Sequence, residues 1–117
     1  MSGPAGKLVV VVEDEDEIRE TLKDVFEDEG YAVAVARDGG EALTLLAQIR
    51  PHVVVLDMNL PVINGDAVYA MLRTDPRLVG VPVVVSTTDP SRAPAGVPLV
   101  RKPANLKHLL DVVRRCS

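Results

Sequence analysis

The sequence predicts one α/β domain built on an open parallel β-sheet that is covered by helices on both faces. Two observations lead to this fold class. Uninterrupted apolar runs rich in β-branched residues, at residues 8–12 and 53–56, are typical of strands buried on both faces of a sheet. Segments with helical periodicity separate the strands, and right-handed β-α-β crossovers then place helices on both sides of the sheet. A length of 117 residues suits one core of ordinary size.

Composition indicates a globular protein and argues against several function classes. Hydrophobic residues make up 47% of the chain and charged residues 26%, so we expect no extensive disorder. A net charge of −4 gives no general attraction to nucleic acid or to an anionic membrane, and we expect neither partner for this domain. The apolar runs are too short to span a bilayer, and residues 1–7 lack the apolar region of a secretory signal. We therefore expect a cytoplasmic location, which agrees with a single cysteine, Cys116.

The first half of the chain alternates strands and helices. The strand at residues 8–12 runs into five consecutive acidic residues, and a helix over residues 16–29 follows, which Asp16 can cap. A loosely alternating strand over residues 31–36 and a helix over residues 41–50 come next. The inward face of the first helix is expected to consist of Ile18, Leu22, Val25 and Phe26.

The second half starts with the strand at residues 53–56, which we expect at the centre of the sheet because all four of its residues are apolar. Asp57 and a turn-rich Asn/Pro/Gly segment follow this strand. The elements expected beyond it are a short helix over residues 65–73, strands over residues 81–85 and 97–100, and a last helix over residues 104–115. We expect residues 1–6 to be a flexible N-terminus.

Carboxylates gather at the strand ends. Glu13 and Asp14 follow the first strand, and Asp57 follows the central strand. A lone Asp at a strand end is more often a strand terminator or a helix cap, but adjacent parallel strands end at the same edge of a sheet, where ligands bind. Three converging carboxylates either raise a pKa or hold a cation, and a set of oxygen ligands favours a hard ion such as Mg²⁺.

Two more strand ends carry polar side chains. Ser86, Thr87 and Thr88 follow the fourth strand, where hydroxyls can satisfy the sheet edge or donate to a phosphoryl oxygen. Lys102 follows the fifth strand, although a lysine at such a position is usually only solvated.

Four motifs resemble the receiver domain of two-component response regulators: V-V-V-V-E-D-E, L-D-M-N-L-P-V-I-N-G, V-V-V-S-T-T and V-R-K-P. They occur in that family's order and cover essentially the whole chain, so the resemblance implies a single receiver domain over residues 1–117. It implies a flavodoxin-like, doubly wound, five-stranded parallel sheet with strand order 2-1-3-4-5. The partners that it implies are a sensor histidine kinase or a phosphotransfer domain, an unidentified downstream protein, and a second copy in a weak homodimer.

The resemblance also assigns roles to the polar side chains at the strand ends. Asp57 would be the phosphoacceptor, Thr87 the switch hydroxyl, and Lys102 a contact of the phosphoryl group. The ion would be Mg²⁺, for which Mn²⁺ can substitute, and its ligands would come from Glu13, Asp14, Asp57 and the backbone carbonyl of Asn59. An ionised carboxylate is a competent nucleophile, and phosphoryl transfer needs positioning and charge neutralisation more than covalent help.

Two departures from the family pattern concern the output of a signal. The aromatic residue expected three positions before the lysine is Leu99 in this chain. Residues 88–96 include Pro90 and Pro94 and are too few for the usual fourth helix, so we expect that helix to be missing or reduced to one turn. With few contacts to hold it, the segment of residues 87–96 is expected to reorganise on phosphorylation.

Three functions remain to be compared. The leading hypothesis is a phosphoacceptor signalling domain, which is not an enzyme beyond its own phosphorylation and dephosphorylation. The second is an interaction module that works without phosphorylation and retains the site by inheritance. A small Mg²⁺-dependent phosphatase is poorly supported, because Asn59 stands where such enzymes need a second acid.

Overall fold

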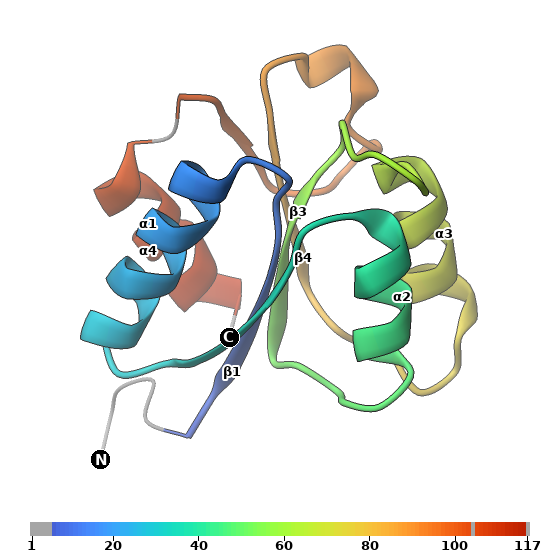
Figure 1. Cartoon of the computed structure of the whole chain (residues 1–117), viewed down its shortest axis with the longest axis horizontal. Coiled ribbons are helices and arrows are strands. Elements are labelled where there is room, and N and C mark those ends of the chain that lie inside the picture. Colours follow the sequence, from blue (N-terminus) through green and yellow to red (C-terminus); the bar gives the residue numbers. More distant parts are fainter. Residues whose placement is uncertain (1–5, 104, 117) are drawn as a thin grey trace.

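The computed structural model describes residues 6–103 and 105–116. Its strands form one parallel sheet in the order β2-β1-β3-β4-β5, which confirms the predicted topology (Figure 1). The strands are β1 (Leu8–Val12), β2 (Ala32–Ala36), β3 (Val53–Asp57), β4 (Val83–Thr87) and β5 (Leu99–Arg101). The helices are α1 (Asp16–Asp28), α2 (Gly39–Leu46), α3 (Gly65–Thr74) and α4 (Leu106–Cys116).

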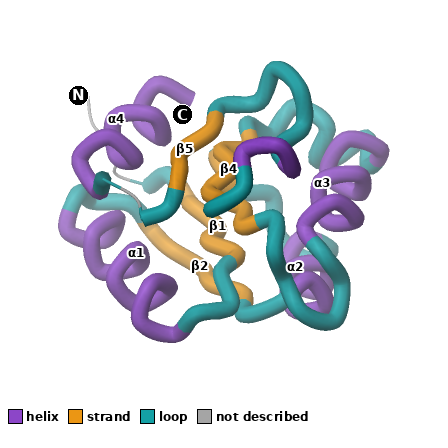
Figure 2. The backbone as a smooth tube through the Cα atoms, turned by 90° about the horizontal axis from the view of Figure 1, so that it is seen from above, coloured by secondary structure: helices purple, strands orange, loops and turns teal. Residues whose placement is uncertain are grey.

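Helices cover the sheet on both faces, with α1 and α4 on one side and α2 and α3 on the other (Figures 1 and 2). Side chains alternate across a strand, so Val9 and Val11 of β1 pack with α1 and α4, whereas Val10 and Val12 pack with α2 and α3. Because both faces are buried, the strand has no polar alternation, which is why its sequence is a continuous apolar run.

Helix α1 differs from its prediction at its first turn. Glu15 occupies the N-cap position without a side-chain hydrogen bond. The expectation that Asp16 caps the helix is wrong, because its carboxylate accepts a hydrogen bond from Arg19 instead. At the other end, Gly30 has a φ of 100°, a conformation that favours glycine and lets the chain turn toward β2.

The bounds of three other elements differ from the predictions for identifiable reasons. Helix α2 spans Gly39–Leu46 rather than residues 41–50. Its start is earlier because the Asp38 side chain accepts a hydrogen bond from the Glu41 backbone N–H and caps the helix there. Strands β4 and β5 begin directly after Pro82 and Pro98, each two residues later than predicted. Proline has no N–H to donate to a ladder, so each strand starts at the residue that follows it.

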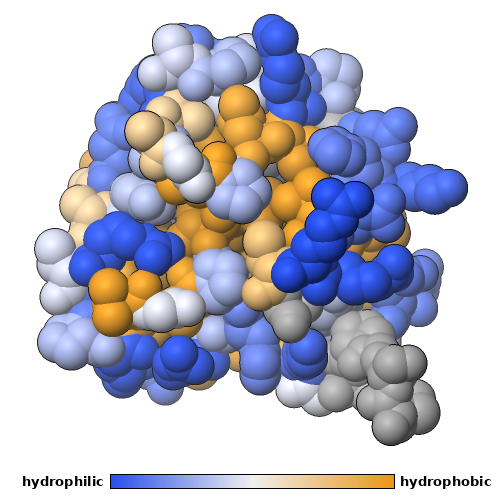
Figure 3. Space-filling view, turned by 180° about the vertical axis from the view of Figure 1, so that it is seen from behind, coloured by the Kyte–Doolittle hydropathy of each residue, from blue (hydrophilic) through white to orange (hydrophobic). Residues whose placement is uncertain are grey.

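The connection between β4 and β5 contains a single turn of 3-10 helix, η1 (Pro90–Arg92), which confirms the prediction of a missing or one-turn helix. On the face of the domain seen from behind, apolar side chains reach the surface in the middle (Figure 3). A cavity of about 240 Å³ adjoins the end of the connection and is lined by Tyr69, Arg73, Pro82, Val83 and residues 95–98.

Two expectations fall on parts of the chain that the structure does not describe. The flexible N-terminus expected over residues 1–6 lies, apart from Gly6, outside the described residues, as does Ala104, the expected start of the last helix. Within the described ranges, none of the helices is both long enough and apolar enough to cross a bilayer.

Candidate functional site

Three carboxylates meet at the carboxyl edge of the sheet. Asp57 is the last residue of β3, and Glu13 and Asp14 follow the adjacent β1. One carboxylate oxygen from each lies within 4.8 Å of the others. Asp57 and Glu13 are buried, and burial raises the pKa of both carboxyls above their ordinary values, whereas Asp14 is exposed.

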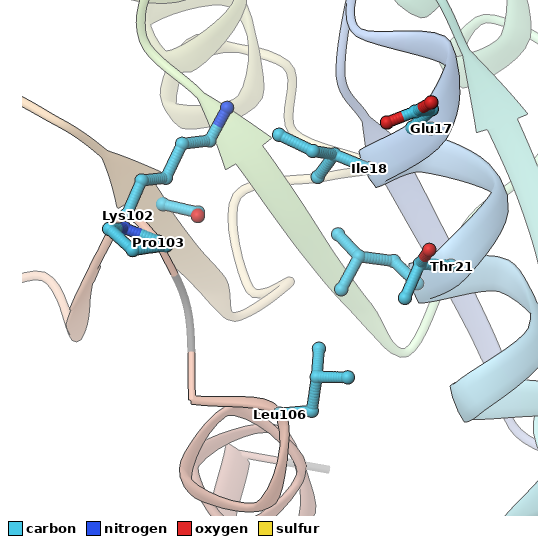
Figure 4. A pocket seen from close by; sticks show the side chains of 8 residues that line it. Glu17, Ile18, Thr21, Lys102, Pro103 and Leu106 are labelled. Atoms are coloured by element: carbon cyan, nitrogen blue, oxygen red, sulfur yellow. The ribbon is translucent and has the colours of Figure 1, made fainter.

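Lys102 supplies the positive charge of this cluster. Its side chain is only 10% exposed, and its Nζ lies 3.1 Å from Asp57 Oδ2 and also contacts the Glu13 carboxylate. Burial alone would lower the pKa of Lys102, but the hydrogen bond to Glu13 and the charge of Asp57 outweigh it and raise this pKa. In Figure 4 the side chain extends from the end of β5 toward the carboxyl end of β3.

A cavity of about 290 Å³ adjoins Lys102 between α1 and the start of α4 (Figure 4). Its lining is mostly apolar and includes Ile18, Leu22, Pro103 and Leu106. Lys102 therefore lies between this cavity and the cluster of carboxylates.

The other oxygen of Asp57 is held by the backbone of the following loop. The Asn59 N–H donates to Asp57 Oδ1 over 3.0 Å. Gly65, at the start of α3, packs so closely behind this loop that an added Cβ would lie 2.5 Å from the Met58 Cα. Both contacts fix the Asp57 carboxylate before any ligand arrives.

Thr87 lies at the end of β4, next to Ser86, which pairs with Asp57 in the register of the two strands. Its side chain is fully buried. The hydroxyl oxygen accepts a hydrogen bond from the Asp89 N–H at 3.2 Å and lies 3.4 Å from the Asp89 carbonyl oxygen, to which it donates. The hydroxyl is thus turned toward the β4–β5 connection.

Arg19 is a site residue that the sequence analysis missed. It is 7% exposed, and its Nη1 donates to the carbonyl oxygens of Glu13 and Asp14 at 3.2 and 3.4 Å. The Arg19 guanidinium therefore holds the backbone of Glu13 and Asp14, the acidic loop that follows β1, in place. The signal that could have identified it is its helical spacing to Leu22 and Phe26, the buried face of α1.

Arg92 of η1 was also missed. Its Nη1 donates to Asn59 Oδ1 at 3.0 Å, and its Nη2 lies 3.4 Å from Asp66 Oδ2. These contacts correct the expectation that residues 87–96 have few contacts to hold them. Both partners are more than twenty-five residues away in sequence, so no local pattern indicates the pairing.

The donor set fits a hard divalent cation. Carboxylate oxygens from Glu13, Asp14 and Asp57 lie close enough to share one ion, and nitrogen or sulfur ligands are absent from this described cluster. Oxygen-only ligands are typical of Mg²⁺ sites, and an exposed Asp14 leaves room for the waters that this ion retains.

Comparisons with curated proteins identify response regulators. The chain is 42% identical over 79 residues to the DNA-binding response regulator MtrA of Mycolicibacterium smegmatis, covering 68% of this chain and 33% of that protein. It is 34% identical over 111 residues to the response regulator MprA of Mycolicibacterium vanbaalenii, covering 91% and 48%. The chain thus spans between a third and a half of the length of these relatives.

Solved structures give the same result at the level of the fold. The chemotaxis response regulator CheY4 of Vibrio cholerae superposes with a TM-score of 0.88 at 29% identity, covering 95% of this chain and 98% of that one. The response regulator TrrA of Thermotoga maritima, in complex with Mg²⁺ and BeF, gives a TM-score of 0.84 at 28% identity, covering 95% and 99%. The response regulator receiver domain family itself matches residues 9–114. This chain therefore belongs to the response regulator receiver domain family.

Proposed function

We propose that this domain accepts a phosphoryl group on Asp57 from the phosphohistidine of a sensor histidine kinase or a phosphotransfer domain. The observation that carries the proposal is the position of Asp57, at the carboxyl end of the central strand, with Lys102 Nζ 3.1 Å from one of its oxygens. The phosphorylated site then changes a contact with a downstream protein.

The transfer is a displacement at phosphorus. A carboxylate oxygen of Asp57 forms the new P–O bond while the P–N bond to the imidazole breaks, and the imidazole keeps the electron pair and takes up a proton. Asp57 must be ionised to act, which burial opposes and Lys102 favours. The same ammonium group faces the oxygens of the incoming phosphoryl group and offsets part of their charge.

Glu13, Asp14, Asp57 and the Asn59 carbonyl would hold Mg²⁺, and the bound ion would supply positive charge where the phosphoryl oxygens come to lie. Arg19 keeps the acidic loop in place for this purpose through its bonds to the loop carbonyls. Because the chain matches only part of the length of its curated relatives, we propose only that the downstream partner is a protein.

The test is incubation with acetyl phosphate and Mg²⁺ followed by intact mass measurement and peptide mapping. We expect a mass increase of one phosphoryl group, located on Asp57, and none in Asp57→Asn. Lys102→Ala should lower the yield, because it removes the fixed positive charge beside the nucleophile. A wild-type protein whose mass does not change would favour the alternative, an interaction module that works without phosphorylation.

A further inference from the structure

A series of hydrogen bonds joins Asp57 to Thr87 by way of Asn59, Arg92 and Asp89. Asp57 Oδ1 accepts from the Asn59 N–H at 3.0 Å, and Asn59 Oδ1 accepts from Arg92 Nη1 at 3.0 Å. The Arg92 N–H donates to the Asp89 carbonyl at 3.1 Å, and the Asp89 N–H donates to the Thr87 hydroxyl at 3.2 Å. The phosphoacceptor and the switch hydroxyl thus belong to one network that runs through η1.

Arg92 is held through its guanidinium and through the backbone turn that carries it. Asp66, in the first turn of α3, gives the guanidinium a second partner at 3.4 Å. At the backbone, the Asp89 carboxylate accepts hydrogen bonds from the Ser91 N–H and hydroxyl at 3.1 and 2.6 Å, and so caps η1. These hydrogen bonds lower the pKa of Asp89, which keeps the cap ionised.

The Arg92 contacts matter because little else ties this segment to the phosphoacceptor loop. Apart from the two bonds between Thr87 and Asp89 at the start of the segment, the side-chain hydrogen bonds that join residues 88–96 to the rest of the described domain come from Arg92. Ala93 and Val97 pack on the core further along the segment. The first part of the connection, from Thr88 to Arg92, is therefore held by the Thr87 hydroxyl at one end and by the Arg92 guanidinium at the other.

Phosphorylation would break this network at Thr87. A threonine hydroxyl has one proton, and this proton points to the Asp89 carbonyl at 3.4 Å. Donating it to a phosphoryl oxygen on Asp57 requires the hydroxyl to turn away from Asp89. The backbone at the start of η1 then loses its hydrogen bond to Thr87 of β4. The remaining contacts are those of the exposed Arg92 guanidinium with Asn59 and Asp66, which are individually weak.

We propose that Arg92 is a positioning residue that latches η1 to the Asn59 loop, and that phosphorylation of Asp57 releases this latch as the output of the domain. This inference rests on the proposed function, because it concerns the regulation of the same site. In place of the missing helix, η1 is then the element with two positions, one latched to the Asn59 loop and one released. The guanidinium favours the latched position and the phosphoryl group favours the released one.

The first test measures amide hydrogen exchange in the absence of any phosphoryl mimic. Arg92→Ala should exchange the η1 amides of Arg92 and Ala93 about threefold faster than wild type, because the fork no longer holds the turn. Arg115→Ala, which removes an exposed arginine near the far end of α4, is the matched control and should leave these amides unchanged. Equal protection in wild type and Arg92→Ala would overturn the proposal.

The second test adds beryllofluoride and Mg²⁺ as a phosphoryl mimic. Wild-type η1 amides should then exchange at the Arg92→Ala rate, and Arg92→Ala should bind beryllofluoride about threefold more tightly, because it has no latch to open. Arg92→Lys keeps the charge but cannot contact Asn59 and Asp66 at once, so we expect it to behave as Arg92→Ala does. If Arg92→Lys behaves as wild type does, charge alone is sufficient and the latch is contradicted. Wild type that binds the mimic with unchanged protection overturns the latch alone, whereas wild type that does not bind it overturns the proposed function as well.

Discussion

Asp57→Asn should stabilise the domain in the absence of Mg²⁺. The carboxylate of Asp57 is buried together with that of Glu13, and burial raises the pKa of both. Keeping both carboxylates ionised while they are buried costs stability. Asparagine keeps the shape and one acceptor for the Asn59 N–H while it removes the negative charge.

The size of the effect follows from the separations. At an effective dielectric constant of about 20, two like charges 4.8 Å apart repel by about 3.5 kcal/mol, and a Lys102 ammonium 3.1 Å from Asp57 returns about 5 kcal/mol. Repulsion from Glu13, together with a solvent-screened share from exposed Asp14, roughly cancels that attraction. The cost of burying the carboxylate then remains, so we expect the substitution to raise the free energy of unfolding by about 1–2 kcal/mol at pH 7.

The dependence on pH has a defined sign. A carboxyl group whose pKa is higher in the folded state binds its proton more tightly there, so it contributes stability that is present below its ordinary pKa of 3.8 and is lost as the pH rises through the folded value. The advantage of Asp57→Asn should therefore be largest at neutral pH and should shrink as the pH falls toward 4.

Urea unfolding at pH 7.5 and 4.5, followed by circular dichroism, measures this difference, with about 10 mM Mg²⁺ or EDTA present in parallel. Mg²⁺ should narrow the difference between the two proteins, since an ion tenfold above its Kd stabilises wild type by about 1.4 kcal/mol and has lost a ligand in the variant. An Asn variant that is less stable than wild type at neutral pH in EDTA, or a difference that grows on acidification, would refute the reasoning.

Three other predictions concern the loop and the cluster. Val62 is 83% exposed and has a φ of 68°, which strains a β-branched residue, so Val62→Gly should raise the Tm by about 3 °C in calorimetry; an unchanged or lower Tm would contradict the strain. Gly65→Ala should cost about 3 kcal/mol or more in urea unfolding, because its Cβ would meet the backbone at the end of β3; a loss under 1 kcal/mol would show that α3 can shift. Arg19→Met keeps apolar bulk but frees the carbonyls of Glu13 and Asp14, so calorimetric titration should show weaker Mg²⁺ binding, whereas Arg115→Ala should bind as wild type does.

The fold could be predicted because its signals are local and agree with one another. Continuous β-branched runs identify β1 and β3, since both faces of a parallel sheet are buried. The bounds that were missed depend on backbone hydrogen bonding. Pro82 and Pro98 set where β4 and β5 begin, and the Asp38 side chain sets where α2 begins.

The candidate site was only partly predictable. The rule that parallel strands end at one edge brings Glu13, Asp57 and Lys102 together without knowledge of any distance. The burial of Lys102 could not be anticipated, because an isolated lysine at a strand end is solvated as a rule and only the two buried carboxylates explain its place. Arg19 was not predicted because a charged residue within an apolar helical stripe normally indicates a break in the buried face, not a buried side chain.

The β4–β5 connection shows most clearly what a sequence pattern leaves out. Two prolines and the short length correctly predict the loss of a helix, yet the inference that the segment is held by few contacts overlooks Arg92. Leu99, in the place of the aromatic residue, packs on the core cluster between the sheet and α2 and α3, as do Ala93 and Val97. The later part of the connection is therefore anchored by apolar contacts. The earlier part, which begins at Thr87, is held by hydrogen bonds of Thr87 and Arg92, and under the proposed function this difference in the kind of contact would determine which part responds.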